Sequence, residues 1–156
     1  MEAHEAWTAE RGAEVIARLK DGDGALLPLL HALQEVFGCI PDAAIRPVAE
    51  ALNLSRAEVH GVVSFYHDFR RSPPGRHVLR LCQAEACQSM GCRALAAQVE
   101  GRLGLRLGET SGDGRVTVEA VYCLGLCATA PSAMLDGQVI GRLTPRRVDA
   151  LLERIA

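Results

Sequence analysis

Two pairs of cysteines, far apart in the sequence, set the strongest limit on how this chain can fold. Cys82 and Cys87 are spaced C-x4-C, Cys123 and Cys127 are spaced C-x3-C, and residues 88–122 separate the two pairs. If the four thiols serve one site, the fold must bring the ends of two separate segments together. In a reducing compartment, six cysteines indicate metal or redox chemistry before structural disulfides.

The charge and the aromatic content of the chain argue against two classes of partner. The formal net charge is −2 at pH 7, and only 4% of the residues are aromatic. Nucleic acid and anionic membranes both favour a clearly basic surface, so neither is expected as a partner. No stretch is apolar for long enough to predict a membrane span. The first residues lack the basic and apolar regions of a secretory signal, and we therefore expect a cytoplasmic protein.

The region 1–72 has the periodicity of short helices. Apolar stripes predict helices over 10–19 and 26–37, and a third helix from Pro41 onward. The segment Ser55-Arg-Ala-Glu58 has the pattern of a capping box and predicts the start of a fourth helix. Four short helices with tight connections indicate a small helical bundle.

The pattern changes after the Pro- and Gly-rich segment 70–76, which predicts a linker or a turn. Helices are predicted over 89–103, with Met90 facing inward, and from Thr144-Pro145 onward. Asp136-Gly137 is typical of a hairpin turn. Strands are predicted over 77–81, 115–122, 133–135 and 139–143. The region 73–156 should therefore form a small mixed sheet with flanking helices, which makes the whole chain α+β.

Each cysteine pair follows a predicted strand, where a loop can turn both thiolates toward one point. Two pairs supply the four thiolates that a [2Fe–2S] cluster needs, one pair for each iron. Structural zinc sites and thioredoxin-type dithiols usually have C-x2-C spacing. Neither cysteine pair of this chain has that spacing. Spacing alone leaves the cluster, a zinc site and redox thiols open. Gly125 would let backbone N–H groups approach a sulfur, which raises the potential of a cluster.

The remaining cysteines and histidines favour structural interpretations. Cys39 and Cys92 are expected to be packing residues. His60 and His67 lie seven residues apart, so they would share one helix face, and we expect surface side chains rather than metal ligands. The arginines between 70 and 80 form either a solvated basic stretch or a docking patch for an acidic neighbour.

Four ordered segments resemble the small thioredoxin-like [2Fe–2S] subunit of respiratory complex I. They are Leu33-Gln-Glu-Val-Phe-Gly-Cys-Ile-Pro41, Val59-His-Gly-Val-Val-Ser-Phe-Tyr66, the Cys82/Cys87 pair, and Tyr122 to Cys127 followed by Ala130-Pro131. The resemblance covers most of the chain. It implies a helical N-terminal part, a thioredoxin-like ferredoxin part, and one [2Fe–2S] cluster held by Cys82, Cys87, Cys123 and Cys127. A zinc interaction module held by the same four cysteines then becomes a remote alternative.

Within that family, the segments 25–31, 52–61 and 84–91 resemble the gamma subunit of bacterial NAD-dependent, molybdenum-containing formate dehydrogenases. That resemblance implies an alpha subunit with molybdopterin and further clusters, and a beta subunit that binds FMN and meets NAD. This chain would be a non-catalytic subunit that exchanges single electrons with FMN. Bidirectional NAD-linked hydrogenases and NADH-quinone oxidoreductase carry similar subunits and remain alternatives. Cys39 stands where the family often has Tyr.

Overall fold

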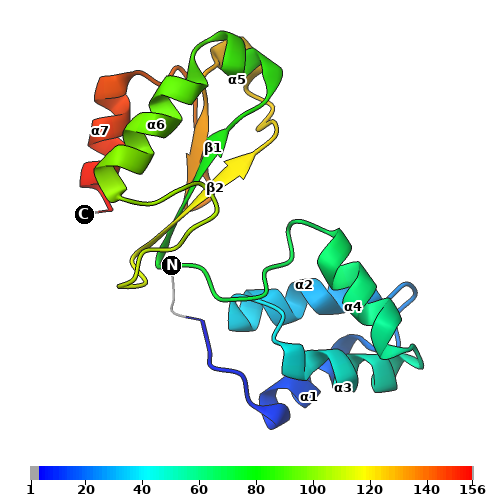
Figure 1. Ribbon diagram of the computed structural model, residues 1–156. Coiled ribbons are helices and arrows are strands. Elements are labelled where there is room, and N and C mark those ends of the chain that lie inside the picture. Colours follow the sequence, from blue (N-terminus) through cyan, green and yellow to red (C-terminus); the bar gives the residue numbers. More distant parts are fainter. Residues whose placement is uncertain (1–3, 156) are drawn as a thin grey trace. The chain divides into compact units, whose positions relative to one another are not determined.

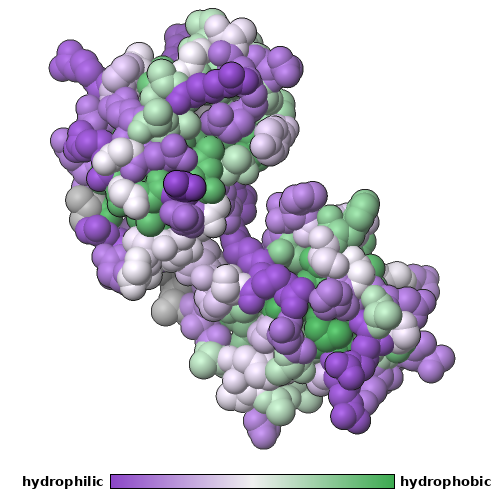
Figure 2. Space-filling view, in the orientation of Figure 1, coloured by the Kyte–Doolittle hydropathy of each residue, from purple (hydrophilic) through white to green (hydrophobic). Residues whose placement is uncertain are grey.

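The computed structural model describes residues 4–155, and the chain divides into two compact units at Pro73 and Pro74. Each unit has its own cluster of buried apolar residues. Figure 2 shows hydrophilic side chains over much of the visible surface of each unit, with apolar side chains between them. No helix among the described residues is long and apolar enough to cross a membrane. The α+β class expected from the sequence is confirmed.

The first unit consists of four helices (Figure 1): α1 (Ala9–Leu19), α2 (Leu26–Phe37), α3 (Asp42–Leu52) and α4 (Arg56–Phe65). Local signals set their ends. The Thr8 side chain accepts a hydrogen bond from the Arg11 N–H at the start of α1, and Gly38 ends α2 with a φ of 74°. The capping box at Ser55 and Glu58 is present with both of its hydrogen bonds. The four helices therefore form where the sequence predicts them.

The core of the helical unit follows from the apolar stripes. Its largest fully buried side chains come from the four helices and the segments beside them: Val15, Leu29, Leu30, Leu33, Phe37, Ile40, Val48, Val59 and Val63. Trp7 lies edge-on to Phe37, with 4.9 Å between the ring centroids. The segment before α1 is therefore anchored to the same core.

The second unit contains a four-stranded sheet with the strand order β2-β1-β3-β4. The strands are β1 (His77–Cys82), β2 (Val116–Val121), β3 (Ala133–Leu135) and β4 (Gln138–Ile140). β1 pairs in parallel with β2 and antiparallel with β3, and β3 and β4 form the hairpin predicted at Asp136-Gly137. The parallel pair requires a crossover connection, which α5 (Glu85–Ser89) and α6 (Cys92–Leu103) provide.

The helix α7 (Pro145–Glu153) follows β4 and lies beside α6 (Figure 1). Asp149 of α7 joins the two helices, because it accepts hydrogen bonds from Gln98 and Arg102 of α6. Thr144 caps α7, as predicted, by accepting from the Arg147 N–H. Val99 and Val148 are among the side chains that fill the core between these helices and the sheet.

Three predicted element boundaries are wrong. α6 begins at Cys92 rather than Ser89, because Gly91 adopts a φ of 85° and separates it from α5. Met90 therefore lies outside both helices and is 60% exposed, not inward as expected. β4 ends at Ile140 rather than at residue 143, because Arg142 has a φ of 50° that no strand adopts. β2 likewise ends at Val121, before Tyr122.

Replacing Gly75 by alanine is expected to destabilise the second unit. A Cβ at this position would lie 2.8 Å from backbone atoms of Val116, and the Gly75 N–H donates to Thr117 Oγ1 at 2.7 Å. The backbone of β2 would have to shift, which costs roughly 1–3 kcal/mol. Urea unfolding followed by circular dichroism measures the loss. The matched change Gly101→Ala, where no atom lies within 4 Å of the added Cβ, should not destabilise the chain.

Candidate functional site

The two cysteine pairs lie at the carboxyl ends of neighbouring parallel strands. Cys82 is the last residue of β1, and Cys87 lies in α5 directly after it. Cys123 and Cys127 lie in the loop after β2. Because β1 and β2 run parallel and Cys82 pairs with Val121, both strands end at the same edge of the sheet, next to α5 (Figure 1). This register brings together four thiols that are far apart in sequence.

The two pairs differ sharply in exposure. Cys82 and Cys87 are each 2% exposed, whereas Cys123 and Cys127 are exposed. Cys82 and Cys87 belong to one buried apolar cluster, and the Sγ atoms of Cys123 and Cys127 are 3.7 Å apart. One pair therefore lies inside the second unit and the other faces solvent.

Several donors surround the sulfur atoms. The Gly125 N–H donates to Cys123 Sγ at 3.3 Å, as the sequence suggests for this glycine. The buried Ser132 hydroxyl lies 3.5 Å from Cys87 Sγ. N–H and O–H donors such as these stabilise a thiolate, the form of cysteine that binds metals. The peptide bond before Pro131 in the same loop is cis.

The environment shifts the pKa values of two of these thiols in opposite directions. Burial by itself raises the pKa of Cys82, but hydrogen bonds from the Ala84 and Cys123 N–H groups and from Cys87 and Ser132 lower it below its usual value. The neighbouring Cys123 raises the pKa of Cys127 through a hydrogen bond and like charge, with smaller contributions from Cys87 and Cys82. Like charge on neighbouring sulfurs therefore opposes ionisation of Cys127, and a cationic centre would relieve that repulsion.

The donor set fits a two-iron cluster better than a single ion. A structural zinc site needs four ligands around one centre, whereas a [2Fe–2S] cluster takes two thiolates at each of two irons. Two separate sulfur pairs at one sheet edge match the second arrangement.

Cys92 is buried, as expected of a packing residue, but it packs against two of the candidate ligands. It is 4% exposed and belongs to the same apolar cluster as Cys82 and Cys87. Burial raises the pKa of Cys92, and the charges of Cys87 and Cys82 add to this effect, so the thiol is neutral at neutral pH. Cys39 is also buried, in the segment between α2 and α3 of the helical unit.

Two neighbours of the sulfurs were missed by sequence reasoning. Ser132 lies against Cys87, and the Gln83 amide oxygen lies 3.6 Å from Cys92 Sγ. Their only signals in the sequence are that Gln83 follows Cys82 and that Ser132 follows Pro131. Neither residue belongs to a recognisable ligand spacing.

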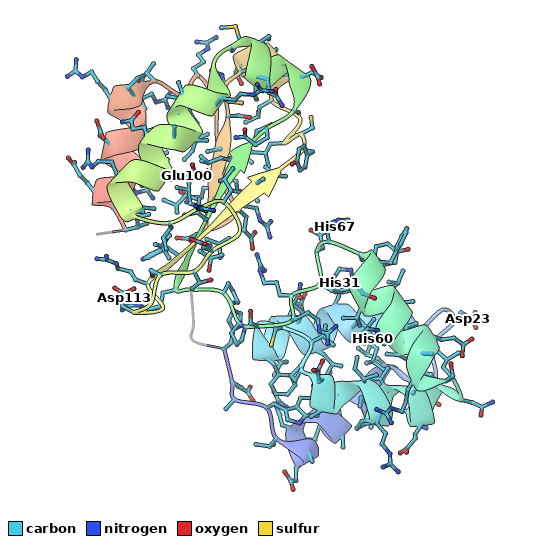
Figure 3. All side chains as sticks on the ribbon, in the orientation of Figure 1. Asp23, His31, His60, His67, Glu100 and Asp113 are labelled. Carbon is cyan, nitrogen blue, oxygen red and sulfur yellow. The ribbon has the colours of Figure 1, made fainter. Side chains whose placement is uncertain are left out.

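The other titratable candidates lie elsewhere. Figure 3 shows His31 on α2, His60 on α4 and His67 after α4. Because α4 ends at Phe65, the expected shared helix face for His60 and His67 is wrong.

Two of the arginines between residues 70 and 80 make ion pairs. Arg71 pairs with Asp42 in the helical unit. Arg80 pairs with Glu119 at 2.8 Å, across β1 and β2 of the second unit. Both arginines thus make ion pairs within their own units.

The chain is similar to known proteins. Residues 12–156 match the model of the thioredoxin-like [2Fe–2S] ferredoxins. The chain belongs to the thioredoxin-like [2Fe–2S] ferredoxin family. Family membership supports one [2Fe–2S] cluster. We call the second unit, residues 74–156, the ferredoxin unit, because it carries the four cysteines of the candidate site.

Two similar relatives of this ferredoxin-family chain are subunits of larger enzymes. An NADH-quinone oxidoreductase subunit of Escherichia coli (strain K12) is 36% identical over 155 residues, covering 98% of this chain and 93% of the relative. The NADP-reducing hydrogenase subunit HndA of Solidesulfovibrio fructosivorans is 33% identical, covering 89% of this chain and 81% of HndA.

One solved structure is also similar to this chain. The air-oxidized NAD⁺-reducing [NiFe]-hydrogenase superposes with a TM-score of 0.72 at 29% identity over 83% of this chain. This ferredoxin-family chain spans 22% of that hydrogenase chain.

Proposed function

We propose that this chain transfers single electrons through one [2Fe–2S] cluster held by Cys82, Cys87, Cys123 and Cys127. The observation that carries the proposal is the parallel register of β1 and β2, which gathers the C-x4-C and C-x3-C pairs at one sheet edge. When bound, such a cluster accepts and returns one electron at a time. The chain has no assigned catalytic residue, and chemistry on a substrate would belong to partner subunits.

The two cysteine pairs and the hydrogen-bond donors of the site have different roles in this proposal. Cys82 and Cys87 would hold the cluster from the buried side, where they pack against apolar neighbours such as Val121 and Ala130. Cys123 and Cys127, which are exposed, would hold it from the solvent side. The Gly125 N–H and the Ser132 hydroxyl stabilise negative charge on the sulfurs.

The parent complex is proposed as a cytoplasmic NAD-dependent formate dehydrogenase. The support is the resemblance of segments 25–31, 52–61 and 84–91 to its gamma subunit. The partners would be a beta subunit that binds FMN and NAD and an alpha subunit that binds molybdopterin and further clusters. The FMN of the beta subunit would exchange single electrons with this chain.

The second candidate is the equivalent subunit of an NAD-linked hydrogenase or of NADH-quinone oxidoreductase. The identity to HndA and to the Escherichia coli oxidoreductase subunit favours it. Affinity purification of the tagged chain from its native host, followed by metal analysis, separates the candidates. Molybdenum in the complex supports formate dehydrogenase, nickel supports a hydrogenase, and co-purifying membrane subunits support the quinone-linked enzyme.

The cofactor itself is tested on the purified chain. We expect a brown protein with about two irons and two sulfides per chain, and an EPR signal after reduction with dithionite. A colourless protein with one zinc would instead identify a zinc interaction module held by four cysteines and would exclude electron transfer by this chain.

A further inference from the structure

The side-chain amide of Gln83 has an unusual hydrogen-bond pattern. Its nitrogen, Nε2, is buried and has no hydrogen-bond partner, whereas its oxygen lies 3.6 Å from Cys92 Sγ. Among the described residues, the other buried side-chain atom of this kind is Arg115 Nε, which has Asp113 as an ion-pair partner at 3.4 Å. A buried N–H group without an acceptor is energetically unfavourable. Because no protein atom accepts from Gln83 Nε2, we expect its acceptor to belong to a bound group.

The backbone holds Gln83 between the two segments that carry the cysteine pairs. Its N–H donates to the Val121 carbonyl at 2.8 Å, and Val121 lies two residues before Cys123. Its carbonyl accepts from Gln88 Nε2 at 2.8 Å, and Gln88 follows Cys87. Its side chain reaches Cys92, which packs against Cys82 and Cys87. The Gln83 side chain, with its unpartnered N–H group, is therefore held against the apolar cluster that contains the buried cysteine pair.

We propose that the Gln83 side-chain N–H donates a hydrogen bond to a sulfur atom of the [2Fe–2S] cluster, and that Cys92 positions this amide. The inference rests on the proposed function, because the acceptor is part of the cluster. The Cys92 S–H donates to the amide oxygen and so fixes which end of the amide carries the free N–H group. The opposite orientation would direct the lone pairs of the amide oxygen toward negatively charged sulfur.

This hydrogen bond raises the reduction potential. The electron that enters the cluster increases the negative charge on its sulfur atoms, so an N–H donor stabilises the reduced form more than the oxidised form. Gln83 thus tunes the cluster from the buried side, while the Gly125 N–H acts on the exposed Cys123. Cys92 acts only through the amide and is a positioning residue.

The test is the midpoint potential of the full chain with its cluster assembled, measured by redox titration monitored by EPR. Gln83→Leu and Gln83→Met both remove the donor, and Met keeps the length of the side chain. We expect the equilibrium constant for one-electron reduction to fall about tenfold, which is about 59 mV toward more negative potential. Gln98→Leu is the control, because Gln98 Nε2 already has Pro145 and Asp149 as partners.

Cys92 provides a rescue experiment. Cys92→Ala removes the donor to the amide oxygen and should lower the potential, whereas Cys92→Ser restores a donor and should return it toward the original value. A potential unchanged in both Gln83 variants would overturn the inference and leave the proposed function intact. Absence of a cluster from the unaltered chain would overturn both. If Cys92→Ser lowered the potential as much as Cys92→Ala, the positioning role would be wrong.

Discussion

Purified Cys123→Ser protein is expected to lose most of its visible absorbance. A serine hydroxyl is a poorer ligand for iron than a thiolate, and the change also removes the acceptor of the Gly125 N–H. The iron content should fall from about two per chain to less than half of that value. Absorption spectra, iron and sulfide analysis, and EPR after reduction measure the effect.

The matched control is Cys92→Ser in the same unit. Cys92 is as buried as the inner ligands and packs against them, yet it is not one of the four proposed ligands. Its variant should keep the absorbance, and so should Cys39→Ser in the helical unit. A bleached Cys92→Ser protein together with an intact Cys123→Ser protein would show that the proposed ligand set is wrong.

Leu33→Ala is expected to destabilise the helical unit by about 2–5 kcal/mol without bleaching the cluster. Leu33 is fully buried in the core formed by α1 to α4, and its truncation leaves a cavity there. The ferredoxin unit has a separate apolar core that does not include Leu33. Urea unfolding by circular dichroism reports the loss of helix stability, while absorbance in the visible range reports the cluster.

Leu79→Ala is the comparison variant for this experiment. Leu79 is 1% exposed in β1, the strand that ends at Cys82 and pairs with both β2 and β3. We expect a similar loss of stability, but here the visible absorbance should disappear in the same transition as the structure of the ferredoxin unit. If Leu33→Ala bleached at the same urea concentration as Leu79→Ala, the two cores would not be independent.

The helices and most of the strands could be predicted because their signals are local. The capping box at Ser55 and the turn at Asp136-Gly137 depend on residues within one or two turns of chain. The errors arose where a single backbone conformation overrides periodicity, as at Gly91 and Arg142. Met90 fits a helical stripe in the sequence, yet Gly91 separates it from α6, and its side chain faces solvent.

The cysteine spacing by itself indicated two pairs that could share a site, and it left a [2Fe–2S] cluster, a zinc ion and redox thiols open. The resemblance of the surrounding segments to a known family then favoured the cluster. Tertiary structure decided how the four cysteines are arranged, because the parallel register of β1 and β2 brings the two pairs to the same end of the sheet. Packing then buries Cys82 and Cys87 and leaves Cys123 and Cys127 exposed. It also placed Gln83, Cys92 and Ser132 beside the sulfurs. No spacing rule could find Gln83 and Ser132, since their contacts with the thiols of Cys92 and Cys87 depend on how the chain folds.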